Sequence, residues 1–314
     1  MLSRVADNLY WMSRYFERAE HTCRLMAVML ESMNERSQAD AEASWPRVVS
    51  ALSGEKFVSG KLEPFEVTQA LAFNRQNPSS LVCSLASARD NGRQVREQIS
   101  TEIWNRLNQL YLKIDPVTLS SIWNDQPGHI FRDILDELYM LEGITWSTMH
   151  HAEGWDFLQL GRYIERAQLV TRLLDVHFGP QGPLDSTRNA IDWIVLLRFC
   201  TGFEAYCKVY TAAIREHRIA EFLVFDQQFP HSVRFAVERV SESLARVGKG
   251  TPQTRRAYCD RLAGRLKASL DFGLIDELMS GSIGGFLTNI RRQCEQIHDA
   301  VYAAYIAYDA EAVS

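Results

Sequence analysis

Apolar residues recur along the opening segment of the chain at alternating spacings of three and four. They are Val5, Leu9, Met12, Phe16, Ala19, Cys23, Met26, Leu30 and Met33. This spacing gathers them on one side of an α-helix, as a seam that packs against other helices. The pattern predicts a helix from Leu2 to about Asn34, roughly 50 Å long at ~1.5 Å per residue.

The opposite side of this predicted helix carries charged residues in an apolar setting. Arg14, Glu17 and Arg18 lie there, together with Tyr10, Trp11 and Leu25. A helix with one face in solvent would be plainly polar on that side. We therefore expect the charges to lie at least partly inside the protein, where each must be paired or must bind something.

A later segment repeats this helix. Residues 14–25 read Arg-Tyr-Phe-Glu-Arg-Ala-Glu-His-Thr-Cys-Arg-Leu, and residues 162–173 read Arg-Tyr-Ile-Glu-Arg-Ala-Gln-Leu-Val-Thr-Arg-Leu, at an offset of 148. Residues 71–81 likewise match residues 223–233, at an offset of 152. Because both matches keep their order, the sequence predicts a tandem duplication with repeats of about 1–150 and 151–314, related by a pseudo-twofold axis.

The second copy of the helix is apolar on nearly every side. Its far side holds Trp155, Leu158, Leu169, Leu173 and Val176 around the charged residues Arg162, Glu165 and Arg166. We interpret the two motifs as one buried Glu-Arg layer. In one interpretation the layer is an ion network in which Arg14 or Arg18 pairs with Glu165, and Arg162 or Arg166 with Glu17.

In the other interpretation the layer is a ligand site, where the arginines hold a carboxylate or phosphate. The candidate binding residues are Arg14, Glu17, Arg18, Arg162, Glu165 and Arg166. Their four arginines exceed their two glutamates by two charges, which other acids, solvent or an anionic ligand must meet. We expect an anionic ligand and a cavity that opens onto at least two of these arginines.

The rest of the chain is also predicted to form helices separated by turns. Further helices are predicted from Trp45 to Gly54, from Pro64 to Phe73, and from Ser80 through Leu110, and later at about 129–150, 154–178, 187–208, 218–225, 232 onward, 251–270 and 283–305. All nine prolines fall between these helices or at their first two positions. Alternating β-branched runs of strand length are missing. The prediction is a single all-α domain over residues 1–314, an internally duplicated helical bundle.

A polar cluster inside the predicted helix after Ser80 supplies secondary candidates. Arg93 and Arg96 lie near Glu102 and Trp104. Such a cluster is most simply a solvated face, and the alternative is a second wall of the charged layer. The polar stretch at 37–43 and the Gly-Pro pairs at 179–183 are predicted connections between helices.

Composition and residue spacing limit the functions that the chain can have. The net charge of −5 disfavours a nucleic-acid partner. The most apolar stretch, residues 191–210, contains four charged residues, so we expect no membrane span. The six cysteines form no CxxC pair, and we expect them to be reduced core residues of a cytoplasmic protein. Glu295 and His298 have the spacing of half a di-iron site, but no second such pair occurs. We therefore predict no metal and no cofactor.

The two motif segments also carry a family resemblance. Residues 14–19 and 161–167, the run Gly-Trp-Asp-Phe-Leu-Gln-Leu-Gly-Arg at 154–162, and residues 93–104 resemble the Alpha-E family of bacterial all-helical proteins, named for its Glu-Arg motif. The family has no settled activity. Its members are typically found beside, or fused to, circularly permuted ATP-grasp proteins and transglutaminase-like proteins.

The resemblance implies a pathway that forms amide bonds and an ATP-grasp-type ligase as partner. The leading hypothesis is an accessory or substrate-binding protein that takes an anionic amino-acid or peptide group at the Glu-Arg layer. One alternative is an enzyme acting on a peptide or amide, with a glutamate as general base and arginines stabilising an oxyanion. A second alternative is a structural adaptor with a closed ion-pair network.

Overall fold

The computed structural model describes residues 1–33, 44–58, 60, 62–124, 127–178, 190–211, 213–247, 253–275 and 283–307, and these ranges contain helices but no strand. The all-α prediction is confirmed for them. The α-helices are α1 (Ser3–Ser32), α3 (Trp45–Ala51), α4 (Pro64–Thr68), α5 (Leu81–Gln94), α6 (Thr101–Ile114), α7 (Leu119–Ile122), α8 (Gly128–Thr148), α9 (Glu153–Phe178), α10 (Ala190–Phe199), α11 (Phe203–Tyr210), α12 (Glu216–Phe225), α13 (Val233–Val247), α14 (Gln253–Asp271) and α16 (Ile283–Val301). Two π-helical turns are η1 (Gln69–Phe73) and η3 (Tyr302–Ile306).

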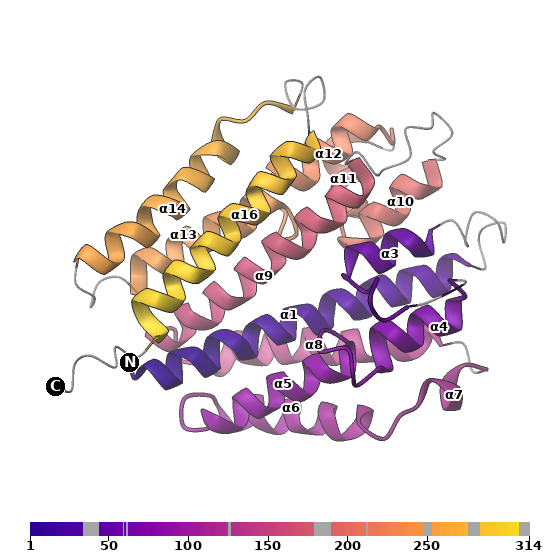
Figure 1. Ribbon diagram of the computed structural model, residues 1–314, viewed down its shortest axis with the longest axis horizontal. Coiled ribbons are helices and arrows are strands. Elements are labelled where there is room, and N and C mark those ends of the chain that lie inside the picture. The colour runs from indigo at the N-terminus through magenta and orange to yellow at the C-terminus, as the bar shows by residue number, and fades with distance from the viewer. Residues whose placement is uncertain are drawn as a thin grey trace.

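The two motif helices, α1 and α9, lie side by side through the middle of the molecule (Figure 1). Helices α5, α6 and α8 lie on the α1 side, and α13, α14 and α16 lie on the α9 side. The buried apolar residues form one cluster that draws on both groups. Because each motif helix has neighbours on several sides, its charged face is covered as well as its apolar seam.

Helix α1 is buried over most of its length, including the positions opposite the seam. Tyr10 is fully buried, and Arg14 and Glu17 retain 6% and 1% of their exposure. The predicted helix over 2–34 is observed as Ser3–Ser32, within the usual variation of helix ends. The expectation that the charged residues of the motif helices lie at least partly inside the protein is confirmed.

A glycine sets the closest approach of α1 and α9. A Cβ added at Gly161 would collide with the carbonyl oxygen of Tyr10 and with the hydroxyl of Ser13. The Ser13 hydroxyl itself donates to that Tyr10 carbonyl at 2.9 Å, so it is held against α1. The backbone of α9 therefore lies directly on α1, one turn before its Glu-Arg pair.

Two predicted helices are each divided into two. The helix expected from Ser80 through Leu110 breaks between α5 and α6, because the Ser100 hydroxyl accepts from the Ile103 N–H and caps a new helix. The helix expected over 187–208 breaks between α10 and α11, where Thr201 has a φ of 52°. The predicted connections at 37–43 and 179–183 lie outside the described residues.

The turns that precede α5 and α13 carry matching hydrogen bonds. The Asn74 side chain accepts from the Gln76 N–H, and the Asp226 side chain accepts from the Gln228 N–H. The Ser80 hydroxyl caps α5 by accepting from Cys83, as the Ser232 hydroxyl accepts from Phe235 at the start of α13. Each residue of the second set stands 152 positions after its equivalent in the first.

Candidate binding site beside the Glu-Arg helices

The two motif helices exchange ion pairs. Glu165 of α9 accepts from Arg14 Nε at 2.7 Å and from Arg18 Nε at 2.8 Å. Glu17 of α1 accepts from Arg166 through Nε at 2.6 Å and through Nη2 at 2.7 Å. The predicted pairing of each glutamate with arginines of the other motif is confirmed, as is the burial of both glutamates.

Charge pairing decides the protonation of these carboxylates. Burial acts to raise the pKa of Glu17, but the charges of Arg166 and Arg162 and the Arg166 hydrogen bonds outweigh burial and lower the pKa to about 2. Arg14 and Arg18 likewise lower the pKa of Glu165 against the effect of its burial. Both carboxylates are therefore ionised at neutral pH and committed to arginines.

Three residues that the sequence analysis did not select complete the layer. Glu20 accepts from Arg24 Nη1 at 2.7 Å, and the Arg24 Nε donates to the Phe199 carbonyl at 2.6 Å. Glu142 of α8 lies 2.5 Å from Arg162 Nη2. The Glu20–Arg24 pair was visible as an i,i+4 spacing, whereas Glu142 is brought in by the packing of α8 on α1.

Glu20 and Glu142 also bear on the expectation that an anionic ligand balances the layer. With Arg24 they bring the layer to five arginines and four carboxyl groups, so the excess of two positive charges counted for the six motif residues falls to one. One cavity beside the layer reaches only Arg18 of the four arginines, and a small apolar one of about 50 Å³ reaches only Arg162. Neither of these two cavities opens onto two of the four.

His298 of α16 is bound to the edge of this layer. Its Nδ1 lies 2.8 Å from the Tyr10 hydroxyl and 3.1 Å from Arg14 Nη1. Burial and the Arg14 charge lower the pKa of His298, so the neutral ring accepts these hydrogen bonds. Within the described residues, no group of three His, Cys, Asp or Glu side chains is placed to hold a metal ion.

A cavity of about 150 Å³ adjoins the layer on the Arg18 side. Three helices contribute pairs of side chains spaced four residues apart, and each pair therefore lies on one helix face. These are Arg18 and Thr22 of α1, Gln168 and Arg172 of α9, and Arg291 and Glu295 of α16. Ser53 and Ser79 add hydroxyls from the segments after α3 and before α5. We call this cavity the three-helix pocket.

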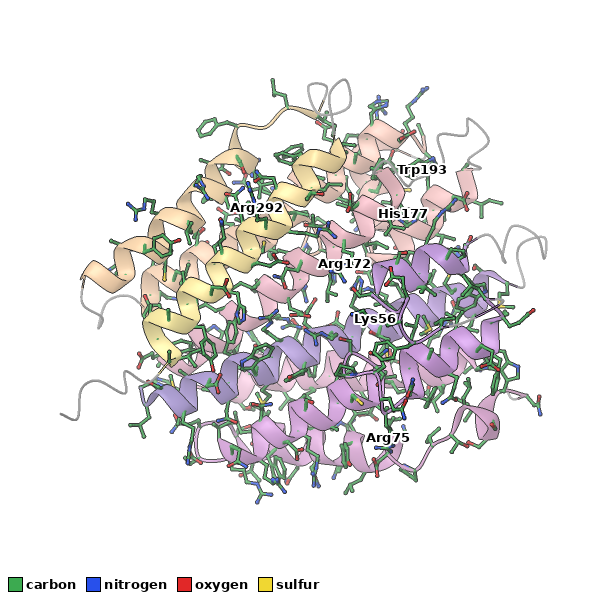
Figure 2. All side chains as sticks on the ribbon, in the orientation of Figure 1. Lys56, Arg75, Arg172, His177, Trp193 and Arg292 are labelled. Atoms are coloured by element: carbon green, nitrogen blue, oxygen red, sulfur yellow. The ribbon has the colours of Figure 1, made fainter. Side chains whose placement is uncertain are left out.

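The charges of the three-helix pocket are unequally paired. Arg18 is bound to Glu165, and Arg291 lies 3.2 Å from Asp175. Arg172 is half-buried, yet it forms no hydrogen bond or ion pair with any residue that the structure describes. Burial and the neighbouring Arg291 charge lower the pKa of Arg172. Figure 2 shows Arg172 on α9, near the middle of the molecule.

Thr22 supplies a second unsatisfied group in the three-helix pocket. Its side chain is 1% exposed, and its hydroxyl has no hydrogen-bond partner among the described residues. A buried hydroxyl without a partner costs free energy that a bound ligand or water can recover. An unpaired cation and an unpaired hydroxyl therefore line the same cavity.

The secondary candidates lie elsewhere. Arg93, Arg96 and Glu102 are exposed around the break between α5 and α6. The Arg96 guanidinium lies 4.0 Å from the centre of the Trp104 ring, and Arg93 lies 3.7 Å from Asp90. This arrangement is that of a solvated face, which was the simpler interpretation of the cluster.

Comparison with known proteins gives the class of this one. The Alpha-E family, described as a predicted alpha-helical domain with a conserved ER motif, matches residues 1–306, so the chain belongs to that family. The Glu17-Arg18 and Glu165-Arg166 pairs are Glu-Arg dipeptides of the kind that this description names. No solved structure matches the chain.

Relatives of the chain include uncharacterized mycobacterial proteins. One from Mycobacterium bovis is 25% identical over 332 residues, and one from Mycobacterium tuberculosis strain H37Rv is 24% identical over the same length. Each alignment covers 97% of this chain and 37% of the relative, so the chain spans little more than a third of their length. None of the helices in the described ranges is long and apolar enough to cross a membrane.

Proposed function

We propose that this protein is an accessory or substrate-binding component of a bacterial ATP-grasp-type amide or peptide ligation pathway, and that it binds an anionic amino-acid or peptide group in the three-helix pocket. One observation carries the proposal. Arg172 is a half-buried cation without a partner among the described residues, in a cavity shared with Arg18 and Arg291. Guanidinium groups bind carboxylates through paired N–H donors, which fits such a ligand.

The Glu-Arg layer supports this pocket from behind. Glu165 accepts from both Arg14 and Arg18, so it fixes the Arg18 side chain at the pocket wall. The residues first selected as ligand contacts therefore act mainly as supports in the proposal. Arg18 and Glu165 are the members of that set that line the cavity.

The ATP-grasp setting rests on the family. The family resemblance implies an association with ATP-grasp proteins, and a ligase of that type is the partner that we propose. An ATP-grasp ligase activates a carboxylate and joins it to an amine, so a companion that holds an amino acid or peptide end fits such a pathway. The greater length of the mycobacterial relatives leaves room for further domains in those chains.

The alternative functions are less well supported by the geometry. A glutamate acting as general base needs a pKa near the working pH, whereas arginines lower the pKa of both Glu17 and Glu165. The closed pairing of the layer itself is what the structural adaptor predicts. The adaptor hypothesis, however, gives no role to the unpaired Arg172.

We further propose that the chain is one domain of two tandem repeats, about 1–150 and 151–314, with a pseudo-twofold relation. The matching turns before α5 and α13 support this proposal. So does the packing of α5 on α1 and of α13 on α9. The exchange of ion pairs between Glu17 and Glu165 and the opposite motif has the reciprocity that a twofold axis requires.

A ligand screen tests the proposed binding. Thermal shift and calorimetry would compare small carboxylates, inorganic phosphate and nucleotides, because a ligand specific to the folded state raises stability. The expected result is stabilisation by a carboxylate that is lost in Arg172→Gln and kept in Arg292→Gln, whose side chain is exposed on α16. Stabilisation by no anion, or an equal response of wild type and Arg172→Gln, would contradict the proposal.

A further inference from the structure

The three-helix pocket holds an unpaired acid as well as an unpaired base. Glu295 lines the pocket and forms no hydrogen bond or ion pair within the described part of the chain. The charges of Glu55, Glu165 and Glu295 act on Arg172, but in the described part of the chain none of these acids forms an ion pair with it. Since Arg18 and Arg291 are paired with Glu165 and Asp175, one cation and one anion remain without partners.

We infer that the ligand of the three-helix pocket is a free amino acid in its zwitterionic form, whose carboxylate binds Arg172 and whose ammonium binds Glu295. The inference rests on the proposed function and names its ligand class. A zwitterion satisfies both unpaired charges at once. A phosphate or a simple carboxylate would satisfy Arg172 but would face the negative charge of Glu295.

The size and lining of the pocket agree with an amino acid. A buried cavity of about 150 Å³ is able to hold benzene, a ligand of six heavy atoms, and the smallest amino acids are of that size. Alongside the two charges, the Thr22 hydroxyl and the Gln168 amide supply neutral hydrogen-bonding groups. Ala51, Leu52 and Leu169 give the same pocket an apolar wall for a small side chain.

The Glu-Arg layer explains why the charges in the pocket remain apart. Arg18 and Glu165 face the pocket but are already bound to each other, and Arg14 also holds Glu165. Arg291 and Glu295 lie one turn apart on α16, an arrangement in which opposite charges usually pair weakly. Here Arg291 binds Asp175 of α9 instead, which leaves Glu295 available to a ligand.

Four probes of similar size separate the two charges. L-alanine carries both charged groups, propionate only the carboxylate, ethylamine only the ammonium, and inorganic phosphate is a different anion. Calorimetric titration of the full chain should give L-alanine an affinity about fivefold higher than that of propionate, because Glu295 is exposed and exposed pairs are weak. Ethylamine and phosphate should bind at least about tenfold more weakly than L-alanine.

Variants assign each group to its residue. Glu295→Gln should bring the affinities for L-alanine and propionate within about twofold of each other. Arg172→Gln should weaken both ligands at least about tenfold, since it removes a charged hydrogen bond. Asp299 is an exposed acid one turn further along α16, and Asp299→Asn should leave the affinities for L-alanine and propionate unchanged. Unchanged melting of each variant without ligand confirms that its fold is kept.

The outcomes distinguish binding of a zwitterion from binding of a carboxylate alone. Equal binding of L-alanine and propionate by the wild type overturns the zwitterion but leaves carboxylate binding in place. A preference for L-alanine that survives Glu295→Gln also overturns it, because the ammonium then lies elsewhere. Binding of none of the probes contradicts the proposed function itself.

Discussion

Helices α1 and α9 carry the same motif, yet the arginine that ends it is buried in one and open in the other. Arg24 of α1 is 2% exposed, bound to Glu20 one turn earlier and to the Phe199 carbonyl. Arg172 of α9 stands at the corresponding position, and the residue one turn before it is Gln168. Without a carboxylate at that position, Arg172 lines a cavity without a partner among the described residues.

The neighbouring residues follow the same division. His21 of α1 is buried beside Arg24, and its counterpart on α9 is Leu169, at the wall of the three-helix pocket. One exchange of a carboxylate for an amide thus separates a closed structural pair from a candidate ligand site. The comparison teaches that a repeated motif need not repeat its role, and that the differences within the repeat locate the site.

The largest expected effect comes from removing a carboxylate of the layer. Glu17→Ala should lower the free energy of unfolding by about 3–5 kcal/mol, because it leaves Arg166 buried without its carboxylate partner. Glu165→Ala should also destabilise, but by less, since Arg18 retains 19% exposure and can turn toward the pocket. Urea denaturation measures both. Equal losses would contradict the difference in burial between the two sides.

A substitution at the point where α1 and α9 cross should lower stability on α9 but not on α1. Gly161→Ala should cost about 1–3 kcal/mol or more, because the new methyl group meets the α1 backbone at Tyr10. Ser13 occupies the corresponding position of α1, and Ser13→Ala removes only a hydroxyl that bonds its own helix. Thermal melts of the two variants give the comparison, and a Gly161→Ala protein as stable as Ser13→Ala would refute the close approach.

Much of this comparison could be predicted from the sequence, because the repeat aligned the two motifs residue by residue. The exchange of ion pairs followed from charges placed among apolar residues such as Leu25 and Leu173. The break at Ser100 was missed because apolar positions continue at helical spacing across it. Arg291 and Glu295 could not be assigned to the pocket, since only tertiary packing brings α16 against α9.

Acid should destabilise the α1 side in a way that α9 cannot match. Burial and the Arg24 charge lower the pKa of His21 to about 3, whereas an unfolded histidine has a pKa of about 6.5. Between these values the unfolded state binds a proton that the folded state does not, so stability falls as pH falls, by up to about 1.4 kcal/mol per pH unit.

His21→Gln should remove this contribution while keeping an acceptor for Arg24. The measurement is the free energy of unfolding in urea at pH 7, 6 and 5 for both proteins. Because all other titrating groups are shared, the difference in slope isolates His21. Parallel slopes would mean that His21 has the same pKa in the folded and the unfolded protein.

The smallest effect on stability should come from making α9 resemble α1. Gln168→Glu places a carboxylate one turn before Arg172, and the half-buried pair should change stability by less than about 1 kcal/mol. Its effect on binding should be large, because the new acid competes for the arginine. Thermal shift with propionate should therefore show no stabilisation of this variant. A response equal to that of the wild type would contradict the idea that Arg172 is available to a ligand because residue 168 is an amide.

The ion pairs between α1 and α9 also constrain when the protein can fold during synthesis. The partner of Glu17, Arg166, lies 149 residues later in the chain. Ribosomes add about 5–20 residues per second, so α1 waits roughly 7–30 s before its buried carboxylate can be neutralised. During that interval the apolar seam of α1 has local partners, but its charged face does not. A nascent chain halted before α9 should therefore stay open to proteases along α1, and the native core should close only after the second motif has emerged.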